Sequence, residues 1–152
     1  MEKKASLNTA WDIGKYVSIL YRIGVSHFSR RMRENEIESG QHAFLFYLFS
    51  HNGSSQDEIS KALSLDKATT TRAINRLESQ KFVERQRDSE DHRINRVFLT
   101  EEGKNLESSL RSISKEWESI LLKGFSDQET QLLKEMLLRL SDNAVQYKLT
   151  KL

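Results

Sequence analysis

The chain has 152 residues, and a hydrophobic content of 37% is enough for the narrow, helix-based core of a single domain. It contains no cysteine, which excludes disulfides, thiolate zinc sites and thiol redox switches, while the absence of proline suits long uninterrupted helices. The formal net charge of +2 does not by itself indicate a nucleic-acid partner, so the distribution of charge along the chain has to be considered.

A long amphipathic helix is predicted over residues 8–37. Apolar residues recur every three or four positions along it, at Ile13, Val17, Leu20, Gly24, Phe28 and Met32. A helix of about 30 residues spans roughly 45 Å, which is longer than a small domain needs. We therefore expect part of it to pack against a second chain; the alternative is that the whole helix folds onto its own domain.

The most apolar stretch of the chain follows, QHAFLFYLFS at residues 41–50, after a break at residues 38–40. A helix here would be apolar on nearly every side, which predicts the buried centre of a lobe. The sequence His-Asn-Gly at residues 51–53 is a turn signal that ends it.

Two short helices joined by a tight turn are predicted next. Ser55 and Glu58 have the spacing of a capping box at the start of the first helix. Asp66 is a favourable N-cap for the second helix, over residues 67–80.

The second of these helices has two different faces. One face is formed by Thr70, Ala73, Ile74 and Leu77, and the opposite face by Ala68, Thr71, Arg72, Asn75 and Arg76. The second set suits a helix in the major groove of DNA, because Arg and Asn bond base edges and phosphates. An ordinary solvated helix face is the alternative.

A β-hairpin is predicted from strands at residues 81–86 and 95–99, with a polar connection at residues 87–93. Residues 81–96 include five basic and four acidic side chains, so the hairpin carries only a slight positive charge. Asp91 lies two residues before Arg93 and can hold its guanidinium at a set angle. An arginine held at a loop tip fits the minor groove of DNA, although the same residues could form a charged loop without a partner.

Two further helices are predicted at the C-terminal end. Thr100 caps a helix over residues 101–123, Gly124 ends it, and Ser126 with Glu129 forms a second capping box for a helix over residues 127–147. Both helices have wide apolar faces that cannot be buried against each other alone. The long N-terminal helix and the same helices of a second chain are the expected cover.

Taken together, these residues resemble the MarR family of transcription regulators. The likeness is carried by Ile59, Leu63, Thr69-Thr70-Thr71-Arg72, Ile74, Leu77-Glu78, Phe82-Val83-Glu84-Arg85, Arg87-Asp88, Asp91-His92-Arg93 and Leu99-Thr100-Glu101-Glu102-Gly103. The D-x-R pair followed by Leu-Thr-x-x-Gly is its most specific part. His92 departs from the pattern, since many relatives carry Arg at that position.

The resemblance implies a mainly α fold with a small β-hairpin wing, organised as one MarR-type domain over residues 1–152. It implies a winged helix-turn-helix lobe at residues 41–103 and dimerisation helices at residues 8–37 and 104–147. The expected function is a sequence-specific transcription regulator, a repressor, that binds double-stranded DNA as a homodimer. Its operator would be a pseudo-palindrome with half-sites roughly 34 Å apart.

By the same resemblance, the helix at residues 67–80 enters the major groove and Arg93 the flanking minor groove, with Asp91 positioning it. The residues expected at the DNA are Lys67, Thr69, Thr71, Arg72, Asn75, Arg76, Arg85, Arg87, Asp91, Arg93 and Arg96. A winged helix that binds another protein is the alternative. It would need an apolar or acidic face on this helix, and Arg72, Asn75 and Arg76 argue against that.

Relatives commonly respond to phenolic or other anionic small molecules that bind between the dimer helices and the DNA-binding lobe. The residues that could line such a crevice are Trp11, Tyr16, His27, Arg31, His42 and Phe46. Aromatic and basic groups around one cavity would suit an aromatic carboxylate. Plain core packing is the alternative for each of them.

No enzymatic activity, cofactor or metal is expected. The sequence shows no nucleophile–base arrangement and no glycine loop that could cradle a phosphate, and its histidines have no i, i+3 or i, i+4 pairing. The peroxide-sensing mechanism of some relatives needs a reactive cysteine, which this chain lacks. No apolar run approaches the roughly 20 residues of a membrane span, and no signal peptide is recognised, so we expect a soluble, cytoplasmic protein.

Overall fold

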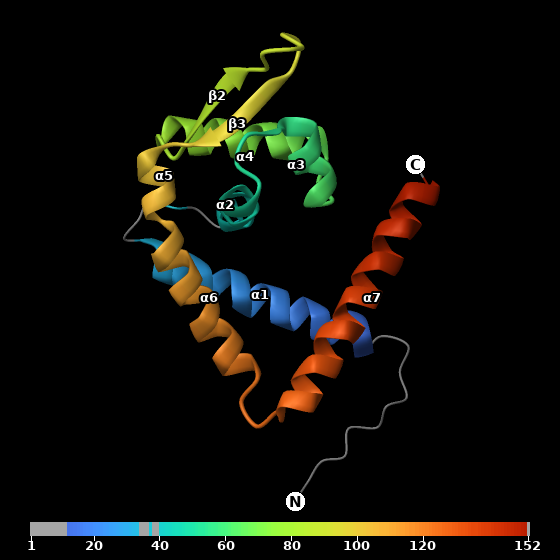
Figure 1. Cartoon of the computed structure of the whole chain (residues 1–152). Coiled ribbons are helices and arrows are strands. Elements are labelled where there is room, and N and C mark those ends of the chain that lie inside the picture. The colour runs from blue at the N-terminus through green and yellow to red at the C-terminus, as the bar shows by residue number, and fades with distance from the viewer. Residues whose placement is uncertain (1–11, 34–36, 38–39, 152) are drawn as a thin grey trace, which may run out of the picture.

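The computed structural model describes residues 12–33, 37 and 40–151. Its elements in chain order are α1 (Asp12–Met32), α2 (Gln41–Ser50), β1 (Ser54–Ser55), α3 (Gln56–Ala62), α4 (Lys67–Ser79), β2 (Val83–Arg87), β3 (Asn95–Leu99), α5 (Glu101–Asn105), α6 (Glu107–Leu121) and α7 (Asp127–Lys151). The fold is mainly α-helical with one small antiparallel sheet, as predicted. Figure 1 shows a lobe formed by α2, α3, α4 and the hairpin, with α1 and α6 below it and α7 running back up toward the level of α3.

Helix α2 lies at the centre of the lobe. Leu45 and Leu48 are completely buried and Phe44 is nearly so. Helices α4 and α6 and strand β3 all pack around α2, which is possible because α2 presents apolar side chains on nearly every side. The prediction of a buried central helix at residues 41–50 is confirmed.

Side-chain caps fix the starts of α3 and α4. At α3 the backbone N–H of Ser55 donates to Glu58 Oε2 (2.6 Å) and the N–H of Glu58 donates to Ser55 Oγ (3.3 Å), which completes the predicted capping box. At α4 the N–H of Thr69 donates to Asp66 Oδ1 (2.7 Å). Both predicted helix starts are confirmed.

The sheet differs from the predicted hairpin in two ways. It has three strands in the order β1-β3-β2, and the short strand β1 pairs Ser54 with Val97. Strand β2 begins at Val83 instead of residue 81, because Lys81 adopts a positive φ of 63° in the turn that leaves α4. The pairing of β2 with β3 was predicted; the additional edge strand was not.

Helix α1 is shorter than predicted at its C-terminal end. The described part starts at Asp12 and ends at Met32, whereas the prediction extended from residue 8, outside the described residues, to residue 37. Ile37 is not helical: its side chain is buried in the lobe core and its N–H donates back to the carbonyl of Met32 (3.4 Å). Burial of Ile37 therefore takes the chain off the helix axis.

The single helix predicted over residues 101–123 is in fact two helices, α5 and α6, separated at Leu106. The N–H of Leu106 bonds to the carbonyl of Gly103 (3.3 Å), a tighter turn than an α-helix makes. Gly103 is packed so closely that an added Cβ would lie 2.0 Å from the carbonyl oxygen of Phe82. Helix α6 ends at Leu121, and α7 continues to Lys151, beyond the predicted end at residue 147.

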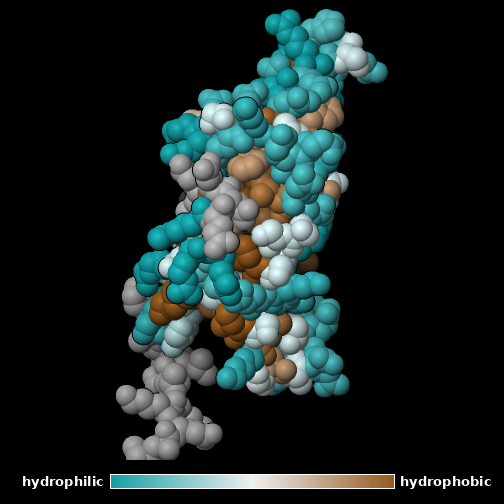
Figure 2. Space-filling model, turned by 90° about the vertical axis from the view of Figure 1, so that its left-hand side faces the viewer, coloured by the Kyte–Doolittle hydropathy of each residue, from teal (hydrophilic) through white to brown (hydrophobic). Residues whose placement is uncertain are grey.

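The lower part of the molecule leaves much apolar surface open. Gly24, Phe28 and Met32 of α1 are buried, and Gly24 lies against the Trp117 ring of α6. Large apolar side chains are exposed in the first half of α1, at the end of α6 and along α7. On the face drawn in Figure 2, apolar surface gathers in the middle and lower parts, whereas the upper end with the wing is almost entirely hydrophilic.

Candidate nucleic-acid interface

One face of helix α4 is buried in the core of the lobe, and the opposite face is exposed to solvent. Thr70, Ile74 and Leu77 are completely buried, whereas Arg72, Asn75 and Arg76 are exposed. The predicted division of this helix into a core face and an outer face is thus present in the structure.

The threonines and the lysine at the start of α4 already have local partners. Thr69 Oγ1 donates to Asp66 Oδ2 (2.7 Å) and accepts from Arg72 Nη2 (3.1 Å). Thr71 Oγ1 donates to the Lys67 carbonyl (2.8 Å), and the Lys67 ammonium forms an exposed ion pair with Asp57 (3.1 Å). Hydrogen bonds from Thr69 hold the pKa of Asp66 below its usual value, so this cap is charged at neutral pH.

Arg85 connects the sheet to the outer face of α4. Its guanidinium pairs with Glu78 and donates to Asn75 Oδ1 (2.6 Å), and only 19% of its side chain is exposed. Sequence reasoning grouped Arg85 with the residues at the DNA. In the structure its guanidinium contacts Glu78 and Asn75, and the second of these contacts orients the Asn75 amide.

At the tip of the wing, Asp91 holds the exposed side chain of Arg93 in one orientation. Arg93 Nε donates to Asp91 Oδ1 and Arg93 Nη2 to Asp91 Oδ2, both at 2.9 Å, and 91% of the Arg93 side chain is exposed. This two-point contact lowers the pKa of Asp91 and raises that of Arg93, because each charge stabilises the other. The predicted pairing of Asp91 with Arg93 is present.

Arg96 and Asp88 form a second ion pair at the base of the wing. Hydrogen bonds from the backbone N–H of Asp91, from Arg96 and from the N–H of Glu90 lower the pKa of Asp88 to about 2. Arg96 also donates to the Gly53 carbonyl (3.1 Å). Arg87, at the end of β2, is exposed.

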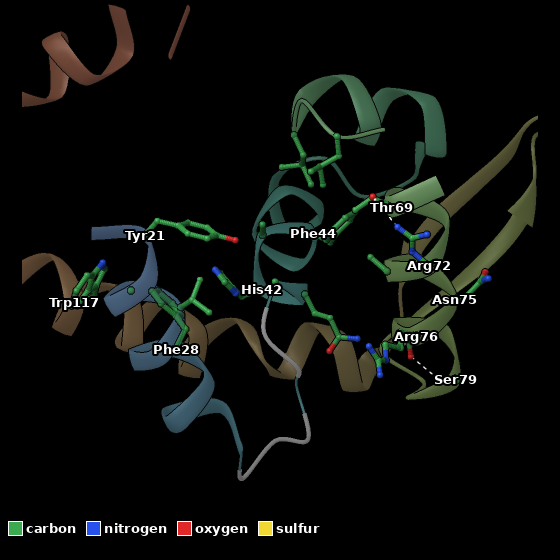
Figure 3. Close-up of a pocket in the computed structure, with 18 of the residues that line it drawn as sticks. Tyr21, Phe28, His42, Phe44, Thr69, Arg72, Asn75, Arg76, Ser79 and Trp117 are labelled. Carbon is green, nitrogen blue, oxygen red and sulfur yellow. Dashed lines mark hydrogen bonds between the residues drawn. The ribbon is translucent and has the colours of Figure 1, made fainter. Parts of the chain in front are cut away.

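A cleft of about 990 Å³ is lined by residues of α1, α2 and α4 together with Trp117 of α6. Figure 3 shows Phe28 and Trp117 on one side of it and Arg72 and Arg76, from α4, on the other. His42 lies against Phe28 with its ring parallel (centroids 4.6 Å apart). Its buried Nδ1 has no hydrogen-bond partner among the described residues, and burial lowers the pKa of His42.

Of the residues predicted to line a ligand crevice, the structure brings His42 to the cleft. His27 stacks on Trp117 behind it (5.2 Å), Arg31 pairs with Glu116, and Phe46 packs against Phe49. Tyr16 is half-exposed on α1, and Trp11 lies outside the described residues.

Sequence reasoning missed the contribution of Tyr21, Phe28 and Trp117 to the cleft. A glycine within the apolar stripe of the first helix, Gly24, was the available signal, because it marks where a large ring from another helix can approach. In the described residues there is no group of three or more His, Asp or Glu side chains that could hold a metal ion. None of the described helices is both long enough and apolar enough to cross a membrane.

Comparison with known proteins connects these features to one family. Residues 37–94 match the family model described as MarR family. A solved structure of a MarR transcriptional regulator from Methanosarcina mazei Go1 is 39% identical, covers 89% of this chain and 97% of its own, and superposes with a TM-score of 0.83. An uncharacterized HTH-type transcriptional regulator of Bacillus subtilis, YybA, is 26% identical over 87% of this chain and 88% of its own length.

The fold is also shared with a Listeria monocytogenes protein, a putative MarR family regulator solved in complex with a 26mer DNA. It is 24% identical over 95% of this chain and 93% of its own, with a TM-score of 0.81. MarR-family regulators act on transcription and are not enzymes, and the predicted family and fold are confirmed. The identity to the Methanosarcina mazei protein, over nearly the whole of both chains, shows that this chain belongs to the MarR family of helix-turn-helix transcription regulators.

Proposed function

We propose that this chain represses transcription by binding a pseudo-palindromic DNA site as a homodimer, with α4 in the major groove and the wing at the adjacent minor groove. The observation that carries the proposal is Arg93, which is exposed at the wing tip and held at two points by Asp91. An arginine fixed in this way can enter a narrow minor groove, where negative potential is strongest, with little loss of side-chain freedom on binding.

The outer face of α4 supports the major-groove part of the proposal. Arg72 and Arg76 can donate to guanine edges or phosphates, and Asn75 can pair with adenine. Lys67, Thr69, Thr71 and Arg87 surround this face and are proposed as phosphate contacts. The Listeria monocytogenes complex supports the docking of this fold on a duplex.

The homodimer is supported by the apolar surface that a single chain leaves open. The exposed apolar side chains include Ile13, Val17, Leu20, Ile120, Leu132, Met136, Leu137 and Leu140. We assign residues 8–37 and 104–147 to dimerisation and residues 41–103 to the DNA-binding lobe of one MarR-type domain. Leu110 and Ile113 are buried in the lobe core, so the start of α6 joins the two parts.

Selection of bound fragments from randomised duplex DNA tests the proposal. We expect two inverted half-sites about one helical turn apart, and an affinity that falls steeply as salt rises. Arg93→Ala should weaken binding by at least about tenfold without dissociating the dimer; unchanged affinity would remove the wing from the mechanism. Expression of a reporter gene downstream of the selected site should decrease when the protein is supplied. Increased expression would refute repression.

We further propose that the cleft binds a small aromatic anion that releases the DNA. The aromatic rings of Phe28 and Trp117 and the guanidinium groups of Arg72 and Arg76 line it, which suits a flat ring with a carboxylate. A structure of Bordetella bronchiseptica BpsR, which shares the fold (22% identity, TM-score 0.75), concerns regulation of its DNA binding by 6-hydroxynicotinic acid.

That compound is therefore a suitable first probe for calorimetric titration. We expect it to bind and to weaken DNA binding, because Arg72 and Arg76 belong both to the cleft and to the outer face of α4. The matched control is 2-hydroxypyridine, which has the same ring without the carboxylate and should do neither. Equal effects of the two compounds would show that charge is not recognised.

A further inference from the structure

We propose that Arg96 and Asp88 are positioning residues that connect the body of the lobe to Arg93, and that Arg96 does not itself contact DNA. This inference rests on the proposed function, in which Arg93 enters the minor groove. It gives a different role to Arg96, which the family resemblance had placed among the residues at the DNA.

The first link runs from the lobe to Asp88. Arg96 Nη1 donates to the carbonyl of Gly53 (3.1 Å) and lies 3.7 Å from Glu58 Oε2, and these two groups flank β1 at the start of α3. Arg96 Nε donates to Asp88 Oδ2. The Arg96 guanidinium therefore joins the base of the wing to Gly53 and Glu58 through Nε and Nη1.

The second link runs from Asp88 to the wing tip. Asp88 Oδ1 accepts from the N–H of Glu90 (2.9 Å) and from the N–H of Asp91 (3.0 Å). The N–H of Asp88 bonds to the Ile94 carbonyl, and the N–H of Ile94 bonds to the Asp91 carbonyl, both at 2.9 Å. The backbone that carries Asp91 is thus fixed from both sides.

The third link is the contact between Asp91 and Arg93. Asp91 Oδ1 accepts from the backbone N–H of Arg93 (3.0 Å) as well as from its Nε. The chain of contacts therefore continues without a break from Gly53 and Glu58 to the exposed guanidinium. Only 12% of the Asp88 side chain is exposed, compared with 91% of that of Arg93, so Asp88 is placed to hold the tip and Arg93 to reach outward.

Charge alone predicts the opposite result for Asp88, which makes the inference testable. Removing a carboxylate near DNA should strengthen binding if only the net charge of the wing matters. Loss of positioning should weaken binding, because Arg93 would then have to be ordered during binding. We expect Asp88→Asn to bind the selected duplex about tenfold more weakly than the unmodified protein.

The matched control is Glu90→Gln. It removes the same charge two residues away, where Asp88 bonds the backbone N–H of Glu90 and not its carboxylate. Glu90→Gln should bind DNA as tightly as the unmodified protein or more tightly. If Asp88→Asn also binds more tightly, the positioning role of Asp88 is refuted.

Arg96→Lys tests the other residue, because it keeps the charge but cannot make the same set of directed bonds. We expect it to weaken DNA binding about tenfold in the unmodified background and to have no further effect when Arg93→Ala is present. A loss that is the same in both backgrounds would show that Arg96 contacts DNA directly and would overturn the inference.

Two readouts separate the possible failures. If Arg93→Ala alone leaves the affinity unchanged, the proposed wing contact fails, and the positioning role fails with it. In the free protein, the NMR signal of the Arg93 Nε proton should exchange with water faster in Asp88→Asn and Arg96→Lys than in the control, at an unchanged thermal unfolding midpoint. If the Arg93 Nε proton exchanges at an unchanged rate in both variants, the positioning role of Asp88 and Arg96 is refuted without any measurement of DNA binding.

Discussion

Asn75 reaches the outer face of α4 with its amide already oriented. Arg85 donates to Asn75 Oδ1 (2.6 Å) and pairs with Glu78 on the same helix. The contact with Arg85 uses one of the two lone pairs of this carbonyl oxygen and fixes the orientation of the amide, so the second lone pair and the NH₂ group face a partner outside the protein in a set direction. A residue of β2 thus fixes the direction of an amide on α4.

We predict that Arg85→Met destabilises the fold by about 1–2 kcal/mol, because Glu78 and Asn75 lose a charged donor that is mostly buried. Urea unfolding measures this. The control is Arg87→Met, which removes an exposed guanidinium two residues along the same strand and should change stability by less than about 0.5 kcal/mol. Equal effects of the two substitutions would show that the bridge between β2 and α4 contributes little.

We expect His42 to make the free energy of unfolding depend on pH. Burial lowers its pKa below 6.5, so the folded state favours the neutral imidazole. This contribution to stability is fully present above pH 6.5 and is lost as the pH falls through the lowered pKa, because the unfolded chain then binds the proton more readily.

We therefore predict that His42→Phe reduces the fall in thermal midpoint between pH 7.5 and pH 5. Differential scanning calorimetry across that range gives the comparison. His92→Gln, at an exposed wing position, is the control and should leave the slope unchanged. A slope that His42→Phe leaves unaltered would show that another group carries the pH dependence.

At the scale of the elements, Gly103 determines how α5 leaves the sheet. An added Cβ would lie 2.0 Å from the carbonyl oxygen of Phe82, and backbone cannot move aside as a flexible side chain can. We predict that Gly103→Ala destabilises the fold by at least about 2 kcal/mol in chemical unfolding. Asn105→Ala, exposed on the same helix, should cost less than about 0.5 kcal/mol. A Gly103→Ala variant as stable as this control would contradict the packing described here.

Local chemistry explains which elements could be predicted from the sequence. Helix α2 is a continuous apolar run between turn signals, and α3 and α4 begin at local caps such as Ser55 with Glu58, so all three were found. Strand β1 has two residues and no alternation, and it exists only because β3, about 40 residues later, pairs with it. The break at Leu106 has no Gly or Pro signal beyond Gly103, and the close packing of Gly103 on the Phe82 carbonyl joins residues about 20 positions apart.

In the candidate site too, local contacts could be predicted from the sequence and tertiary contacts could not. The pairing of Asp91 with Arg93 is local and could be predicted from two-residue spacing. The partners of Arg85 and Arg96 could not, because they depend on how β2, β3 and α3 come together. The family resemblance placed these arginines at the DNA, and the structure adds their contacts within the protein.

At the scale of the whole molecule, α7 exposes apolar side chains that no other part of the described chain covers. Leu132, Met136, Leu137 and Leu140 are each about half exposed. Such a surface is unfavourable in water and is expected to be covered by a second copy of the chain.

We predict that Leu140→Glu raises the dimer dissociation constant at least about a hundredfold, because a carboxylate would have to be buried without a partner. Sedimentation equilibrium over a range of concentrations measures it. Ser141→Glu adds the same charge at the next, exposed position and should leave the dimer intact. Equal behaviour of both variants would place the interface elsewhere.

Arg72 and Arg76 belong at once to the wall of the cleft and to the outer face of α4. If the cleft binds the effector proposed above and α4 binds DNA, thermodynamic linkage makes the two equilibria reciprocal. Any factor by which an occupant of the cleft lowers the affinity for DNA is the factor by which DNA lowers the affinity for that occupant. The effector concentration needed to release DNA then depends on the affinity of the operator as well as on the protein. A tightly bound promoter would need a higher effector concentration for release than a weakly bound one, so a single regulator could switch several genes on in sequence.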